Sequence, residues 1–166
     1  NDEIEQCNAE GNLNIQLVTN EPKAFDSTMA HYGKFSGVNN YIVLAGKKSE
    51  KLDEKIGFYG ERIALKAQML GLNTCWVAMS FSKGTAKKNI ALSSGEKMVT
   101  VLAVGYGAVN GVPHKSKKMT DLCKTDKEMP EWFKNGMEAA MLAPTAMNQQ
   151  KFLFTLENDK VYAKSL

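Results

Sequence analysis

The chain has 166 residues, of which 43% are hydrophobic and 23% are charged, proportions typical of a globular protein. Its net charge of +3 comes from 21 Lys and Arg against 18 Asp and Glu residues. These charges are mostly interspersed, as on a solvated surface, and give no sign of a nucleic-acid partner. No apolar run reaches the roughly 20 residues that cross a bilayer. We therefore expect a soluble protein with no membrane partner.

Three cysteines, Cys7, Cys75 and Cys123, stand far apart and lack the spacing of a zinc site. We therefore expect reduced thiols, no metal and a cytoplasmic location. The length fits a single domain over residues 1–166. The chain begins in a helix-like pattern and stops just after a predicted hairpin, so we expect it to be trimmed at its N-terminus and at its C-terminus.

Two strands are predicted in the first third of the chain. Residues 13–18 alternate apolar and polar side chains, which indicates a half-buried strand after a helix at residues 2–9. A short helix is expected at residues 22–29, followed by a loop. Residues 41–45 form a continuous β-prone apolar run, which is typical of a central strand buried on both faces.

The middle of the chain predicts two helices and two strands. Between residues 56 and 70 apolar residues recur every three or four positions, with Ser49 as a candidate cap and Gly71 as a stop. A second buried strand or extended segment is expected at residues 73–79, a short helix within 82–92, and a third central strand at 98–104.

The last third predicts a helix and a hairpin. Pro130 opens the helix, and Ala143–Pro144 ends it, since the residue before proline disfavours the helical conformation. Strands at 152–156 and 161–163 flank a turn at Asn158–Asp159. Strands interspersed with helices predict a mixed sheet packed by helices.

A polar elbow follows the last helix. It places Thr145, Asn148 and Gln149 between two rigid elements, where a hydroxyl and two amides can donate or accept hydrogen bonds. A flat heteroaromatic ligand with carbonyls and ring nitrogens along its edge needs such partners. The alternative is an elbow that only caps the helix and starts the strand.

A basic loop, His114 to Lys118, follows the strand at 98–104. In an extended segment Lys115 and Lys117 point the same way, and two ammonium groups beside a serine suit a terminal phosphate. The alternative is an ordinary solvated loop. No P-loop, no GxGxxG and no nucleophile motif is present, so we expect no catalytic side chain.

Three segments together resemble the FMN-dependent nitroreductase superfamily. Residues 143–150, Ala-Pro-Thr-Ala-Met-Asn-Gln-Gln, resemble its A-P-S-x-x-N-x-Q-P elbow. Residues 57–79 resemble its alanine-rich helix and G-L-G-T-x-W segment, and residues 101–118 its late strand, glycine turn and basic loop. The elbow here follows the other segments, as in a divergent branch of the superfamily. The family's N-terminal R-x-S-x-R phosphate clamp is missing.

The resemblance implies an α+β, nitroreductase-like fold: a mixed, mainly antiparallel sheet flanked by helices. It also implies a set of FMN-binding residues. The elbow would edge the isoalloxazine ring, Lys34 would approach its pyrimidine side, the backbone of Ala78 and Met79 would face N5, and the basic loop would contact the phosphate. The full set is Lys34, Ala78, Met79, Lys115, Lys117, Lys118, Pro144, Thr145, Ala146, Asn148 and Gln149.

The implied activity is an NAD(P)H oxidoreductase. NAD(P)H would give a hydride to FMN, and a nitroaromatic, a quinone or a similar acceptor would then be reduced in the same slot. A homodimer is expected, with a monomeric pseudo-dimer as the alternative. Two other functions stay open: a non-catalytic flavin- or nucleotide-binding protein on the same scaffold, and a small basic interaction domain without cofactor.

Overall fold

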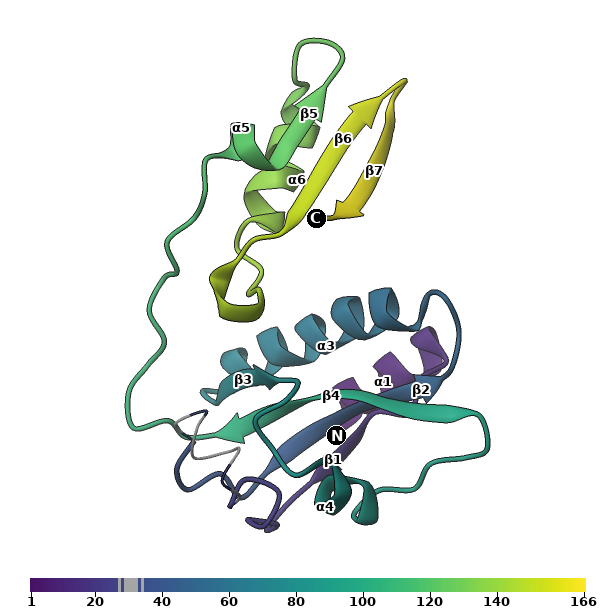
Figure 1. The fold of residues 1–166 in the computed structure, drawn as a ribbon, viewed down its shortest axis with the longest axis vertical. Coiled ribbons are helices and arrows are strands. Elements are labelled where there is room, and N and C mark those ends of the chain that lie inside the picture. Colours follow the sequence, from purple (N-terminus) through teal and green to yellow (C-terminus); the bar gives the residue numbers. More distant parts are fainter. Residues whose placement is uncertain (27, 29–32, 34) are drawn as a thin grey trace. The chain divides into compact units, whose positions relative to one another are not determined.

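The chain divides into two units, Asn1–Gly111 and Val112–Leu166. A computed structural model describes residues 1–26, 28, 33 and 35–166 (Figure 1). The predicted Lys34 and part of the helix expected at 22–29 lie outside the described residues. The single domain expected over residues 1–166 stays a prediction.

The first unit is built on a four-stranded antiparallel sheet. Its strands are β1 (Gln16–Val18), β2 (Tyr41–Lys47), β3 (Asn73–Val77) and β4 (Glu96–Gly105), in the order β1-β2-β4-β3. Every residue from Tyr41 to Gly46 is buried, which confirms the predicted central strand. The strand at 73–79 was expected to be buried, but β3 is an edge strand that is only half-buried and ends at Val77.

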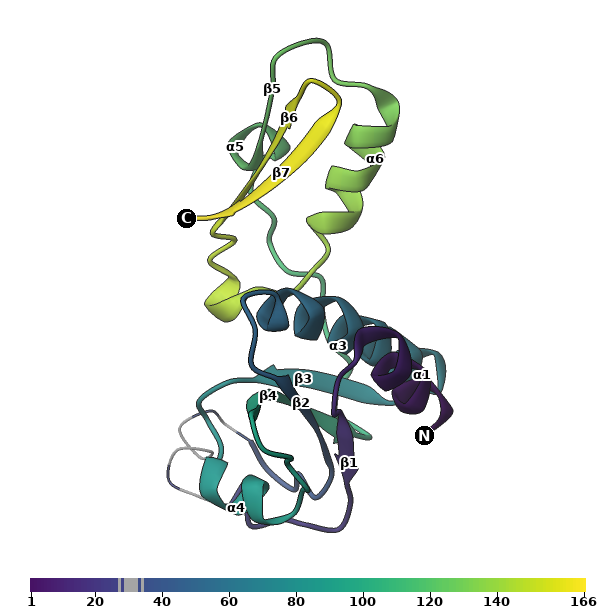
Figure 2. The same ribbon diagram turned by 90° about the vertical axis from the view of Figure 1, so that its right-hand side faces the viewer.

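Helices cover both faces of this sheet, which explains the continuous apolar run of β2. Helices α1 (Asp2–Gly11) and α3 (Leu52–Met69) lie on one face and α4 (Lys83–Lys88) on the other (Figures 1 and 2). Successive strand residues point to opposite faces. Accordingly Ile42 and Leu44 pack with α1 and α3, while Tyr41 and Val43 join the core on the α4 side.

The long helix ends as the sequence predicts but begins differently. Gly71 follows α3 with φ +79, and the N–H groups of Gly71 and Leu72 donate to the carbonyls of Gln68 and Ala67. This is a Schellman ending, which needs a residue that tolerates positive φ. Ser49 does not cap the helix with its side chain: only its backbone carbonyl accepts a bond, from the N–H of Leu52, and the N-cap position is Lys51.

The second unit is a three-stranded sheet with one main helix. It comprises α5 (Met119–Leu122), β5 (Cys123–Thr125), α6 (Glu131–Ala140), the 3-10 turn η1 (Ala146–Asn148), β6 (Phe152–Glu157) and β7 (Lys160–Ser165). The strand order is β5-β6-β7, with β5 parallel and β7 antiparallel to β6. Helix α6 lies along one face (Figure 2) and contributes Phe133 and Met137 to the core.

The predicted hairpin is confirmed. Asn158 and Asp159 both have positive φ, 50 and 58, as a two-residue type I′ turn requires. Helix α6 ends three residues earlier than expected, at Ala140, and η1 and a short loop link it to β6. The α+β class with mainly antiparallel sheets flanked by helices is therefore confirmed, although the strands form two sheets rather than one. No helix of the described ranges is long and apolar enough to span a membrane.

Gly60 lets α3 approach the sheet. A Cβ atom there would lie 2.4 Å from a ring carbon of Trp76 and 2.8 Å from a methyl of Leu44. We predict that Gly60→Ala lowers the free energy of unfolding by about 1–3 kcal/mol, because the helix or the indole must move. On the same helix, Gly57 has nothing within 4 Å of such an atom, and Gly57→Ala should raise stability by about 0.5–1 kcal/mol.

Urea unfolding of both variants measures the difference. Equal effects of the two substitutions would show that Gly60 has no packing role.

Candidate functional site

The elbow of the second unit has an unusual backbone. Met147, Asn148 and Gln150 have φ of 52, 53 and 49, values in the left-handed region that non-glycine residues adopt seldom and at a cost. Asparagine tolerates this region best, while methionine does not favour it. A conformation of this kind persists only where surrounding contacts fix it, so its hydrogen bonds must supply that restraint.

Gln150 makes most of the hydrogen bonds that restrain the elbow backbone. Its side chain is buried, with 3% exposure. The amide Nε2 donates to the carbonyl of Lys115 and to Oδ1 of Asn148, both at 2.9 Å, and Oε1 accepts from the backbone N–H of Lys117 at 2.8 Å. The backbone N–H of Gln150 donates to the hydroxyl of Thr145 at 3.0 Å. One buried residue therefore joins the elbow to the basic loop.

Four predicted ligand residues belong to this network. Asn148 Nδ2 donates to the same carbonyl of Lys115 at 2.9 Å, and Lys117 Nζ donates to the carbonyl of Gln150 at 3.3 Å. The structure thus joins Asn148, Thr145, Lys115 and Lys117 in one network, while their contact with a cofactor stays a prediction. It also shows that both polar groups of the Asn148 amide already have protein partners.

Other predicted groups of the second unit stay available to a ligand. The Gln149 amide is exposed, and its one contact is at 4.0 Å from the sulfur of Met147. Thr145 accepts a bond, and its hydroxyl hydrogen remains to be donated. Within the part of the chain that the structure describes, Lys115 and Lys118 form no ion pair. Pro144 and Ala146 are exposed and add apolar surface beside these donors.

This donor set fits the edge and phosphate of FMN in chemical type. The isoalloxazine edge needs donors and acceptors, which Thr145 and Gln149 offer, and a phosphate dianion suits two unpaired ammonium groups. One further atom fits: Nδ1 of His114 in the basic loop is buried without a hydrogen-bond partner among the described residues. Buried polar atoms are seldom left unpaired, so this nitrogen is an open position for a ligand or a water molecule.

The predicted residues of the first unit follow β3. Ala78 and Met79 are exposed just beyond the strand end at Val77, and the carbonyl of Met79 accepts from the N–H of Phe81 at 2.9 Å. Trp76 packs against α3, and its Nε1 donates to Glu61 at 3.0 Å. Trp76 therefore takes the structural role that its apolar surroundings favoured.

The cysteines lie outside this set. Burial raises the pKa of the Cys7 and Cys123 thiols, which keeps both in the unreactive protonated form. Cys75 is exposed on β3. Across residues 1–26, 28, 33 and 35–166, no three His, Cys, Asp or Glu side chains gather as metal ligands.

Sequence reasoning missed Gln150, the best-connected residue of the site. The signal was present: Gln150 is the second polar residue of the N-x-Q pattern in the elbow. Its neighbour Gln149 was selected instead, because residue type alone does not tell which of two adjacent glutamines is buried.

We predict that Gln150→Leu frees the basic loop. The N–H of Lys117 would lose its acceptor, so its amide hydrogen exchange should speed up at least tenfold. Gln149→Leu, one position away on an exposed side chain, is the matched control and should leave that rate unchanged. Amide hydrogen exchange of both variants, measured by NMR or mass spectrometry, tests this prediction. Unaltered protection of Lys117 in Gln150→Leu would show that the loop is held by other contacts.

The chain is similar to known proteins in sequence and in fold. A family model described as "Putative TM nitroreductase" matches residues 1–166. Among solved structures, a putative nitroreductase from Thermotoga maritima is 22% identical with a TM-score of 0.57, over 78% of this chain and 54% of that chain. The chain therefore spans about half the length of that protein.

Two further structures are described as putative NADH dehydrogenase/NAD(P)H nitroreductase. The one from Bacteroides thetaiotaomicron is 18% identical with a TM-score of 0.54, over 73% of this chain and 82% of that chain. The one from Parabacteroides distasonis is 19% identical with a TM-score of 0.54, over 73% and 83%. At these identities the likeness shows the fold. No protein of curated function matches the chain.

Proposed function

Because the chain belongs to the family described as "Putative TM nitroreductase", we propose that it is an FMN-dependent NAD(P)H oxidoreductase that reduces nitroaromatics, quinones or similar acceptors. The observation that carries the proposal is the network around Gln150, which holds a polar elbow and a basic loop in one arrangement. A ring edge and a phosphate are the two parts of FMN that such an arrangement would bind.

The elbow would bind the ring through groups that the protein does not already use. Thr145 would donate its hydroxyl hydrogen, and Gln149 would donate or accept through its amide. Pro144 and Ala146 would contribute backbone and apolar contact. Asn148 would act mainly by fixing the carbonyl of Lys115. FMN, when bound, supplies the hydride-transfer chemistry between NAD(P)H and the acceptor.

The basic loop would bind the phosphate. Lys115 and Lys118 have no competing carboxylate among the described side chains. Lys117 is anchored to Gln150 at both its N–H and its ammonium group, so it would add fixed positive charge. Charge-assisted hydrogen bonds to phosphate are among the stronger polar interactions. Ala78, Met79 and Lys34 remain proposed contacts for the N5 and pyrimidine sides.

The direct test uses the natural protein at full length. After incubation with FMN and removal of free cofactor, the protein should be yellow, and NADH or NADPH should bleach the flavin band without oxygen. A colourless protein would refute FMN binding. A yellow protein that neither nucleotide bleaches would identify the non-catalytic binder instead. Mass measurement in solution would distinguish the proposed homodimer from a monomeric pseudo-dimer.

The basic loop makes a selective prediction. Lys115→Gln combined with Lys118→Gln should weaken FMN binding about tenfold, which corresponds to about 1.4 kcal/mol. The same variant should leave the affinity for riboflavin unchanged, because riboflavin lacks the phosphate. Lys124→Gln, an exposed lysine on β5, is the control for general loss of charge. Titration by flavin fluorescence measures all three, and parallel losses for FMN and riboflavin would contradict a phosphate role.

The elbow makes a second prediction. Gln149→Leu should weaken FMN and riboflavin alike, by about three- to tenfold, because it removes a ring-edge partner worth roughly 0.5–1.5 kcal/mol. Asn148→Ala should also weaken FMN binding without unfolding the protein, and it should in addition loosen the basic loop. If Gln149→Leu binds both flavins normally, the ring does not contact this part of the elbow.

A further inference from the structure

A cavity of about 390 Å³ opens on the first unit, and none of the predicted FMN-binding residues lines it. Its walls come from both helices of the α1–α3 face and from three strands. Most of the lining is apolar, including Leu17, Ile42, Ile63, Ala67, Leu72 and Val104.

The cavity runs from the core to exposed apolar side chains. Ile42 and Ile63 line it and are buried members of the α1–α3 core, and Ala67, which also lines it, is buried as well. At its rim Leu70 is 64% exposed and Tyr106 is 86% exposed. Large apolar side chains gathered around a hollow are stabilised when an apolar ligand covers them. The apolar lining thus favours a ligand whose apolar part lies inside the cavity.

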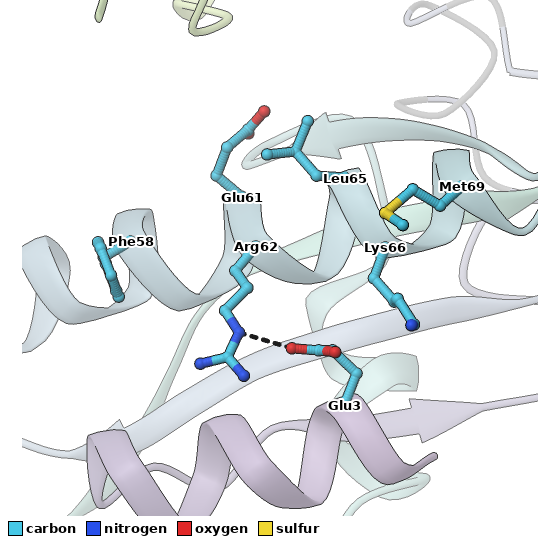
Figure 3. A pocket seen from close by; sticks show the side chains of 7 residues that line it. All are labelled: Glu3, Phe58, Glu61, Arg62, Leu65, Lys66 and Met69. Atoms are coloured by element: carbon cyan, nitrogen blue, oxygen red, sulfur yellow. Dashed lines mark hydrogen bonds and ion pairs between the residues drawn. The ribbon is translucent and has the colours of Figure 1, made fainter. Parts of the chain in front are cut away.

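The two charged side chains at the rim differ in whether they are already paired. Glu3 lines the cavity, but its carboxylate pairs with Arg62 at 2.6 Å. Lys66 also lines it, and its ammonium group has no hydrogen bond or ion pair among the described residues. Figure 3 shows Arg62 and Lys66 pointing from α3 toward α1, where Glu3 lies. The acid is therefore neutralised and the lysine remains free, so the rim favours an anionic group.

We infer that this cavity binds an amphipathic monoanion, a medium-chain carboxylate whose apolar chain enters between α3 and the sheet and whose carboxylate meets Lys66. The volume lies near the lower end of the roughly 300–1,000 Å³ of small-molecule sites, which suits a medium chain rather than a long one.

A larger hollow of about 600 Å³ on the same helix is less suited. It is lined by Phe58, Leu65 and Met69 together with Glu61 and Arg62 (Figure 3). There Arg62 is paired with Glu3 and Glu10, and Glu61 accepts from Trp76. Apart from Lys66, which lines both hollows, it offers no free cation for an anionic head among the described side chains, and the Glu61 carboxylate has no cationic partner there.

The experiment titrates the natural protein with decanoate and with the neutral decanol by isothermal titration calorimetry. Decanoate should bind at one site, and Lys66→Gln should weaken it about tenfold while leaving decanol unchanged. Lys87→Gln, on α4 at the opposite face of the sheet, is the matched control and should change neither. Methyl NMR should show shifts at Ile42 and Ile63, which line the cavity, and none at Ile56, a core neighbour that does not.

Several outcomes overturn the proposal. These are no saturable binding of decanoate, equal weakening by Lys66→Gln and Lys87→Gln, or methyl shifts that spare Ile42 and Ile63. The proposal rests on none of the predicted FMN-binding residues, so failure of either proposal leaves the other standing.

Discussion

The buried amide of Gln150 holds the proposed cofactor site together. An amide side chain has two N–H donors and an oxygen with two lone pairs, and here both donors and one lone pair are used within the protein. If the basic loop moved away, a buried amide would lose its partners at a cost of roughly 1–3 kcal/mol. The loop position is therefore fixed mainly by Gln150, with Asn148 adding a second bond to the carbonyl of Lys115, and the same bonds maintain the left-handed backbone around them.

That arrangement changes how the elbow motif is understood. Asn148 stood out in the sequence as a ring contact, yet its amide is committed to Lys115 and Gln150. The groups left for a ligand are the Thr145 hydroxyl and the Gln149 amide. A polar loop can thus contain residues that hold the loop in shape and residues whose polar groups are free to bind a ligand. Only the hydrogen-bond geometry distinguishes the two kinds.

The sequence predicted correctly those features that depend on residues close together in the chain. The buried strand at 41–45, the end of α3 at Gly71 and the hairpin turn at Asn158–Asp159 depend on local patterns, and all three were predicted correctly. Elements α5 and β5 have four and three residues, too few to show a period. β5 also pairs in parallel with β6 some 30 positions away. The bond between Gln150 and Lys117 spans 33 positions, so the sequence could suggest the residue types but not the pairing.

In the first unit, too, the position of proposed cofactor-binding residues depends on a contact between residues far apart in the chain. Where the chain leaves β3 determines where the backbone of Ala78 and Met79 lies, and β3 is an edge strand with β4 as its only strand neighbour among the described strands. Its other support is Trp76, which lies over Gly60 and donates to Glu61 on α3. A side chain at position 60 would displace the indole, and the strand end would shift with it. Gly60 has no side chain, and this fixes the position of the Ala78 and Met79 backbone that is proposed to face the cofactor. Gly60 itself would contact neither the cofactor nor the substrate.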